Sequence, residues 1–385
     1  MKTYVPAIQL RGEVIYPGPK ADHTPFKLKY GPDGKIAVAL FAPPDPELHN
    51  AKRLLVMPGE GRAGVIPEKV RHIVELGGRA HFLETLGLKG IGLLIDIGGI
   101  KAYSIHPRIA TFQDDLGVMS LRRAHQNLEI ARQLSSMGVR TEIPEFIIRL
   151  HEIPVIKNKG EKPTILSIND ARKHGLISGE AEPVIYGRGL GVPYRVNHLW
   201  LKGPNNEEKR EMLRETFKFL NREEKYYAKK NKGAPATFNE TDPHGYIEWF
   251  ARTLARNLSN MHSKRMAHNN IRPFTSGFGG LAFEDPSNIW LDCRLADLGS
   301  VIVPGDAADF DKGKQKDLKD ARALIGKFSS EVLKVFKGRR WLPGKYSSWE
   351  AYYGRLFDDV YAGKARKAES ETGFSNLLRK IGLRK

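Results

Sequence analysis

The stretch that decides the expected fold reads Asn288-Ile-Trp-Leu-Asp-Cys-Arg-Leu-Ala-Asp-Leu-Gly-Ser300. It sets Asn288 and Asp297 nine residues apart, each at the outer end of a short apolar run. We expect two adjoining strands, which would bring the Asn288 amide and the Asp297 carboxylate together. Hard oxygen ligands of this kind suit a Mg²⁺ ion that is bound to phosphate. Taken alone, Asp297-Leu-Gly is more typical of an ordinary turn, because the D-x-G pattern is common.

The segment upstream is Met261-His-Ser-Lys-Arg-Met-Ala-His-Asn-Asn-Ile-Arg-Pro273. It ends a predicted helix whose apolar residues recur at helical spacing: Ile247, Phe250, Leu254, Leu258 and Met261. Together the two segments resemble a protein-kinase helix and catalytic loop, of the type L-H-S-K-x-x-x-H-R-D-x-K-P, followed by the metal-binding Asn and the D-F-G motif. The resemblance implies an α+β, protein kinase-like two-lobed fold in which Asn288 and Asp297 hold Mg²⁺.

One residue of the kinase pattern is missing. Asn270 stands where the pattern has its catalytic aspartate, and an amide cannot take a proton from a hydroxyl as a carboxylate can. Asp285 is the candidate for a replacement general base, and a plain turn residue in Glu284-Asp-Pro-Ser287 is the alternative. The chain is therefore expected to be either a binding-only pseudokinase or an enzyme that arranges its transfer differently.

The N-terminal half indicates which kinase-like family is nearest. Glu75-Leu-Gly-Gly-Arg-Ala80 is followed by Leu86-Gly-Leu-Lys-Gly-Ile-Gly92, and then by Leu121-Arg-Arg-Ala up to Met137-Gly-Val-Arg-Thr141. This order resembles the selenoprotein O family, whose pattern runs L-G-D-G-R-A, L-K-G-x-G, then L-R-x-x before a helix that ends in L-G-I-x-T. Members of that family have a kinase-like fold that binds ATP in a reversed orientation. They transfer AMP, rather than phosphate, to protein hydroxyl groups.

The resemblance implies a set of nucleotide-binding residues. Lys89 would neutralise nucleotide phosphate charge from a strand, and Lys101 in Gly99-Ile-Lys-Ala-Tyr103 is the competing candidate. Gly77 and Gly78 would form a turn over the nucleotide, because glycines let backbone amides approach phosphate oxygens.

Two arginines extend this set. Arg188 and Arg195 lie seven residues apart and are similar to the arginines of the family's R-x-A-P-S-x-x-R segment, which hold phosphates. Guanidinium groups suit phosphate oxygens and stay charged. Two surface arginines in a basic protein are the alternative.

Lys89 also needs an acidic partner. A helix is predicted from Ser120 to Met137, with Gly138 as its stop, and an ungapped alignment sets Asn127 where the family has its helix glutamate. Glu129, two residues further on, is therefore expected to reach Lys89. A helix residue that faces solvent is the equal alternative.

Composition limits the other possibilities. The 385 residues carry 62 Lys+Arg and 44 Asp+Glu, a net charge of +18, and are 41% hydrophobic, as in ordinary folded proteins. This excess favours nucleotide phosphates, nucleic acid or an anionic surface, and a solvated basic surface is the simplest alternative. Nucleic acid is not favoured, because the aromatic residues do not cluster with the basic ones. The single cysteine leaves no Cys-based zinc site, and no apolar run is long enough to span a membrane.

The expected organisation is a β-rich arm over residues 1–65, a small lobe over 66–202, and a helical large lobe over 203–385 that ends in a basic tail. The expected function is ATP- and Mg²⁺-dependent transfer of AMP to hydroxyl side chains of a protein substrate in the cytoplasm. An inactive nucleotide-binding pseudokinase scaffold and a phosphotransferase are the alternatives.

Overall fold

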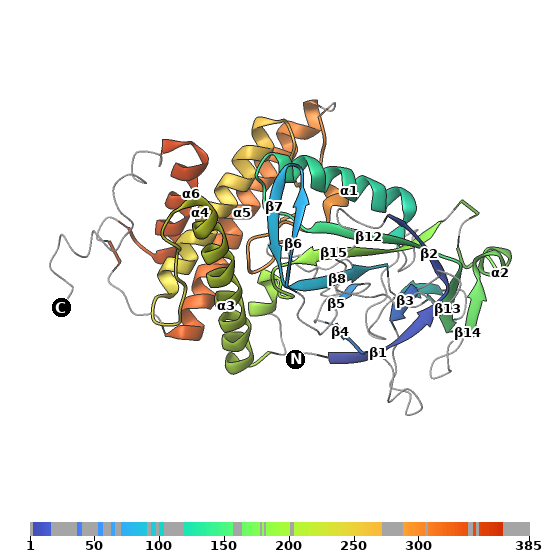
Figure 1. Ribbon diagram of the computed structural model, residues 1–385. Helices are drawn as coiled ribbons and strands as arrows, with labels where there is room; N and C mark the ends of the chain where they lie inside the picture. The colour runs from blue at the N-terminus through green and yellow to red at the C-terminus, as the bar shows by residue number, and fades with distance from the viewer. Residues whose placement is uncertain are drawn as a thin grey trace. The chain divides into compact units, whose positions relative to one another are not determined.

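The structure is a computed structural model that describes residues 3–16, 37–40, 53–56, 63–65, 71–90, 94–97, 100–103, 119–156, 164–177, 179–180, 182–200, 204–271, 288–304, 307–337, 342–343 and 346–364. The chain divides into two compact units. The first contains Met1–Thr237 and Phe274–Val301, and the second contains Phe238–Pro273 and Ile302–Lys385. Helices and antiparallel strands occur together, which confirms the mixed α and β class (Figure 1).

A large antiparallel sheet forms the frame of the first unit. Among the described residues it has nine strands in the order β2-β12-β15-β8-β5-β4-β1-β3, with β11 paired to β15. The strands are β1 (Thr3–Leu10), β2 (Gly12–Tyr16), β3 (Ala37–Leu40), β4 (Arg53–Val56), β5 (Ala63–Val65), β8 (Thr85–Lys89), β11 (Met119–Ser120), β12 (Ile143–Leu150) and β15 (Pro183–Leu190). Residues 1–65, predicted as an arm, thus supply five strands to the same sheet as the predicted small lobe.

The centre of this sheet is buried on both faces. Every residue of β8 and β15 is buried, as expected for strands that are covered on two sides. In their antiparallel pairing Lys89 lies opposite Tyr186, and Gly87 lies opposite Arg188. Opposed residues of an antiparallel pair share a face, so Lys89, Tyr186 and Arg188 project from the same side of the sheet.

Helix α1 (Leu121–Ser136) covers that side of the sheet (Figure 1). The predicted helix is confirmed: the Ser120 side chain caps its start by accepting a hydrogen bond from the Arg123 amide, and it ends at Ser136, two residues before Gly138, whose φ is +78°. A left-handed conformation of this kind favours glycine. Ala124 and Leu128 of the helix pack on Tyr186 of β15.

Two smaller sheets complete the β structure of the first unit. Strands β6 (His72–Leu76) and β7 (Arg79–Leu83) form a hairpin, and β10 (Ile100–Tyr103), β9 (Leu94–Ile97), β13 (Glu152–Ile156) and β14 (Thr164–Ser167) form a sheet in that order. The β6–β7 turn consists of Gly77 and Gly78, both with positive φ, as a two-residue hairpin turn requires. A short helix, α2 (Ile168–Lys173), follows β14.

The long charged helix α3 (Asn206–Asn231) belongs to the first unit, together with a short 3₁₀ helix, η3 (Val196–Leu199). A capping box between Asn205 and Glu208 fixes the start of α3. The boundary that was predicted near residue 202 therefore differs from the division of the chain, which falls after this helix.

The second unit is helical. Its helices α4 (Pro243–Ser263), α5 (Ala307–Phe336) and α6 (Trp349–Tyr361) pack against one another, and the apolar stripe predicted on α4 is fully buried. The Asp317 carboxylate accepts hydrogen bonds of 2.7 Å from the backbone amides of both His268 and Asn269, which fixes the loop after α4. None of the helices in the described part of the chain combines the length and hydropathy of a membrane span.

Replacing Gly187 by alanine tests how tightly the central strands pack. A Cβ at this position would lie 2.5 Å from the Phe146 ring on the neighbouring strand. We expect overpacking to lower the free energy of unfolding by about 1–3 kcal/mol, measured by urea unfolding. The control is Gly179→Ala, where nothing lies within 4 Å and little change is expected. Equal effects of the two substitutions would contradict this packing.

Candidate functional site

A hairpin over residues 288–297, here called the Asn288–Asp297 hairpin, forms the base of the candidate site. Ile289 pairs with Leu295 in antiparallel register, and the Ala296 amide donates to the Asn288 carbonyl at 2.8 Å. The turn is closed by a 2.8 Å hydrogen bond from the Cys293 amide to the Trp290 carbonyl. The two segments expected to adjoin therefore do so, through isolated bridge pairs rather than as regular strands.

Two other chain segments pair with this hairpin through backbone hydrogen bonds, one on each side. On one side, the Leu295 amide donates to the Arg140 carbonyl at 2.9 Å, and the Glu142 amide donates to the Leu295 carbonyl at 3.0 Å. On the other side, the Val196 amide donates to the Ile289 carbonyl at 2.9 Å. These pairings fix the backbone positions of Glu142 and Arg195 relative to the hairpin.

Lys89 reaches the hairpin from the end of β8. It is only 6% exposed, and its Nζ lies 3.3 Å from Asp297 Oδ1 and 3.8 Å from Glu142 Oε1. The competing candidate, Lys101, lies on the edge strand β10 of a different sheet, in register with Asp96. Of the two lysines, Lys89 is the one that meets Asp297.

The two predicted arginines meet at one aromatic ring. Arg188 donates to Glu142 Oε2 at 2.6 Å, and Arg195 donates to Asn288 Oδ1 at 3.0 Å. Their guanidinium carbons lie 5.2 and 5.0 Å from the ring centroid of the buried Trp290, within the range of cation–π attraction. We call the resulting group the Lys89 cluster: Lys89, Glu142, Arg188, Arg195, Asn288 and Asp297.

A glycine makes room for this arrangement. A Cβ at Gly87, which faces Arg188 across the strands, would lie 3.1 Å from the arginine Nε. The glycine in Leu86-Gly-Leu-Lys-Gly90 therefore accommodates the buried guanidinium. The sequence pattern alone does not indicate this role for Gly87.

The acidic partner predicted for Lys89 is wrong. Glu129 is exposed on α1 and accepts a 3.1 Å hydrogen bond from Gln133. The carboxylate beside Lys89 belongs to Glu142, which the sequence reasoning missed and which no motif marks. Asn127 is buried, and its Oδ1 lies 3.7 Å from the position of a Cβ at Gly299. Asn127 thus lies beside the Asp-Leu-Gly turn, but its amide carries no charge to pair with Lys89.

The charges of the cluster depend strongly on one another. Burial lowers the pKa of Lys89, and the nearby Glu142 and Asp297 oppose that effect. For Glu142, burial alone would raise the pKa, but Lys89 and Arg188 outweigh it and hold the pKa below its ordinary value. Three cations face two carboxylates, and the Asp297 side chain is 39% exposed. The cluster is therefore positive on balance and reachable from solvent, as a phosphate site requires.

Two predicted site residues, Gly77 and Gly78, do not join this cluster. Gly77 packs on the end of α1, where a Cβ would lie 2.6 Å from the Ser136 amide nitrogen. Gly78 lines a cavity to which no residue of the Lys89 cluster contributes. The prediction that these glycines cover the same ligand as Lys89 is therefore not supported by their contacts. Asp285 lies outside the described residues.

The chain matches no protein-family model and no curated protein. Within the described residues, no group of three or more His, Cys, Asp and Glu side chains gathers as a metal site would. Asn288 and Asp297 thus offer two oxygen donors. The remaining ligands of a Mg²⁺ ion at this place would be phosphate oxygens and water, which is how Mg²⁺ commonly binds to phosphate-transfer sites.

Substitution of Glu142 by glutamine tests its role between the two cations. The change leaves Lys89 and Arg188 buried beside a neutral amide, and we expect a loss of about 3–5 kcal/mol in the free energy of unfolding. Glu129→Gln is the matched control on the exposed face of α1 and should change it by less than about 0.5 kcal/mol. A larger loss for the Glu129 variant would restore the original assignment.

The same carboxylate predicts a pH dependence. The pKa of Glu142 in the folded protein lies below the ordinary value of 4.5. Its stabilising contribution is therefore complete above that value and is lost as the pH falls through the lower, folded-state pKa. Urea unfolding between about pH 3 and pH 6 should show a shallower acid destabilisation in Glu142→Gln than in the wild type. Parallel pH profiles would be inconsistent with an ionised Glu142.

Proposed function

We propose that this protein binds a magnesium nucleoside triphosphate at the Lys89 cluster and transfers AMP to a hydroxyl side chain of a protein substrate. The observation that carries the proposal is the meeting of Lys89, Arg188 and Arg195 with Asn288 and Asp297. These residues come from distant parts of the sequence, and each is of a type that binds phosphate or a metal ion. Chance surface cations would not gather around two buried or half-buried oxygen donors.

The donor set fits Mg²⁺. Asn288 and Asp297 supply hard oxygens, and the exposure of Asp297 leaves room for phosphate and water beside them. A bound Mg²⁺ would neutralise charge on the phosphate oxygens and help to orient them. Lys89 and Arg195 already hold the Asp297 carboxylate and the Asn288 amide by hydrogen bonds, so both donors are oriented in advance.

Lys89, Arg188 and Arg195 would bind the triphosphate and offset its charge. Glu142 keeps Lys89 and Arg188 in place, and the Trp290 ring supports both guanidinium groups. In the transfer, the substrate hydroxyl oxygen bonds to the α-phosphorus while the bond from that phosphorus to the bridging oxygen breaks. Pyrophosphate leaves with the electron pair, and the hydroxyl proton passes to a base. Positioning and charge neutralisation supply most of the acceleration in such a site.

The choice of AMP over phosphate rests on two sequence features. Asn270 replaces the aspartate that accepts the substrate proton in protein kinases. The order of motifs from Glu75 to Asp297 resembles the selenoprotein O family, whose members transfer AMP. The kinase-like fold belongs to this proposal: a lysine at the end of a strand reaches the aspartate of an Asp-Leu-Gly turn, as in kinases.

One observation favours a binding-only pseudokinase as the second candidate. Glu142 lies within ion-pair distance of both Lys89 and Arg188, so its single negative charge partly offsets two of the three cations before any phosphate arrives. These cations would then stabilise less of the charge that develops on the phosphates during transfer. A site of this kind suits ATP binding more than catalysis.

Labelled ATP distinguishes the candidates. With Mg²⁺ and a mixture of candidate protein substrates, label should be transferred from α-labelled ATP and not from γ-labelled ATP. Asp297→Asn keeps the left-handed backbone that Asp297 adopts, because asparagine tolerates it. We expect this variant to lose transfer by at least about 100-fold. Transfer by the Arg195→Gln variant should fall roughly 10- to 100-fold, because the substitution removes a charge-assisted contact.

Arg122→Gln is the matched control, because Arg122 is exposed on α1, and it should retain transfer within about twofold. Transfer of the γ label would identify a phosphotransferase. Binding of ATP in equilibrium dialysis without transfer of either label would identify a pseudokinase. Failure to bind ATP would refute the site itself.

A further inference from the structure

A second site, separate from the Lys89 cluster, lies in the first unit beside the β6–β7 turn. It is a cavity of about 380 Å³ between that turn, the end of α1, the last turns of α3 and Arg294 of the Asn288–Asp297 hairpin. We propose that this cavity, here called the β6–β7 cavity, binds a small organic phosphate. Its volume lies within the range of small-molecule sites.

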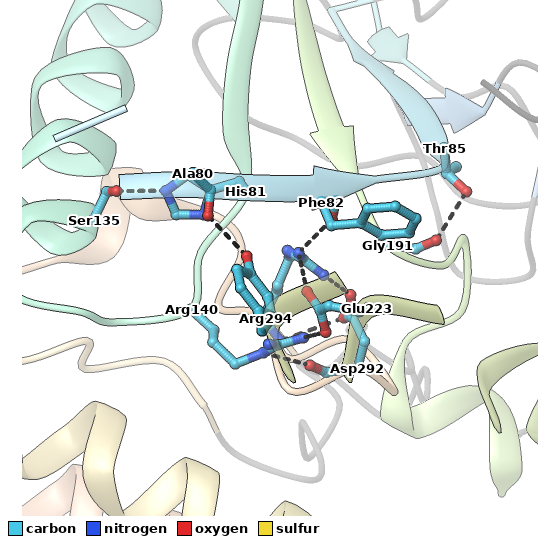
Figure 2. Close-up of polar contacts among 11 residues, drawn as sticks. Ala80, His81, Phe82, Thr85, Ser135, Arg140, Gly191, Glu223, Asp292 and Arg294 are labelled. Atoms are coloured by element: carbon cyan, nitrogen blue, oxygen red, sulfur yellow. Dashed lines mark hydrogen bonds and ion pairs between the residues drawn. The ribbon is translucent and has the colours of Figure 1, made fainter. Parts of the chain in front are cut away.

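The wall of the cavity is a fixed group of buried charges (Figure 2). Glu223 of α3 accepts hydrogen bonds from Arg140 at 2.7 Å and from Arg294 at 3.0 Å. Arg294 also pairs with Asp292, and Arg140 donates to the Asp292 backbone carbonyl at 3.0 Å. Burial alone would raise the pKa of Glu223, but the two arginines hold it below its ordinary value. Two cations and two carboxylates thus balance each other.

The mouth of the cavity carries two further cations. Arg79 follows the β6–β7 turn, and Lys230 lies near the end of α3; both are exposed and line the cavity. In the described part of the chain, neither has a carboxylate partner. The Arg79 guanidinium lies over Gly138, 3.0 Å from the position that a Cβ there would occupy. These two side chains are available to a ligand.

The charge balance favours an anion. Four cationic side chains line the cavity, against Glu223 and the neighbouring Asp292. Helices α1 and α3 both end here, and each C-terminus adds roughly half a negative charge. His81 adds no positive charge near neutral pH, because burial and the nearby Arg294 lower its pKa to about 4. The sum remains positive, and the surplus lies at the mouth.

The geometry suits a phosphate monoester. Arg79 and Lys230 come from different elements, so they can contact different oxygens of one dianionic group. Nothing lies within 4 Å of the position of a Cβ at Gly78, which leaves the turn backbone open to a ligand. Tyr227 lines the cavity and is held by a 2.8 Å hydrogen bond from its hydroxyl to the Ala80 carbonyl, so its ring offers a fixed wall for the organic part.

Titration calorimetry at constant ionic strength tests this site, with ribose 5-phosphate, inorganic phosphate and ribose as probes. We expect ribose 5-phosphate to bind, inorganic phosphate to bind more weakly and ribose not to bind. The double variant Arg79→Gln/Lys230→Gln should weaken ribose 5-phosphate binding by at least tenfold. The matched control Arg122→Gln/Lys218→Gln removes two exposed cations from outside the cavity lining and should change it by less than twofold.

A third variant, Arg195→Gln, separates this site from the Lys89 cluster and should leave ribose 5-phosphate binding unchanged. Loss of binding in that variant would overturn the proposal, because the ligand would then lie at the Lys89 cluster. Equal weakening in both double variants would also overturn it, since general charge attraction would suffice. The proposal would also be overturned if ribose 5-phosphate did not bind to the wild type at millimolar concentrations. None of these results depends on whether the protein transfers AMP.

Discussion

The carboxylate of Glu142 lies between two buried cations, Lys89 and Arg188, and the rest of the candidate site depends on it. Charges removed from water are tolerated only where opposite charges neutralise them nearby. The Glu142 backbone is itself fixed by its hydrogen bond to Leu295, so the pairing of one hairpin sets this carboxylate as well as Asp297. A shift in that pairing would deprive Lys89 of both of its acidic neighbours.

The Asn288–Asp297 hairpin also joins two groups of charges that do different things. At its open end, Asn288 and Asp297 belong to the Lys89 cluster, while Arg294 near its turn belongs to the wall of the β6–β7 cavity. Only Leu295 and Ala296 lie between Arg294 and Asp297, and both are fully buried. Closely packed interiors transmit small displacements, so a movement of Arg294 would also displace Asp297.

Much of the Lys89 cluster could be predicted from the order of motifs along the chain, because each motif carries its own chemistry. The acidic partner could not, because an alignment of α1 gives a position and not a charge: Asn127 faces the turn, and the compensating carboxylate comes from Glu142 next to β12. The sequence indicates the turn at Gly77 and Gly78, but it does not indicate which residues pack against that turn. Strand β2 pairs with β12 far along the chain, a choice that local patterns in residues 1–65 do not reveal.

Lys89 and Asp297 are 208 residues apart in the sequence, which has a consequence for newly made protein. A ribosome that adds about 5–20 residues per second needs roughly 10–40 s to travel from one to the other. Phe238–Pro273 of the second unit is also synthesised before the first unit is complete. In the nascent chain the Lys89–Asp297 ion pair therefore forms only after that interval, and earlier folding of the first unit can use the apolar contacts between α1 and the central strands.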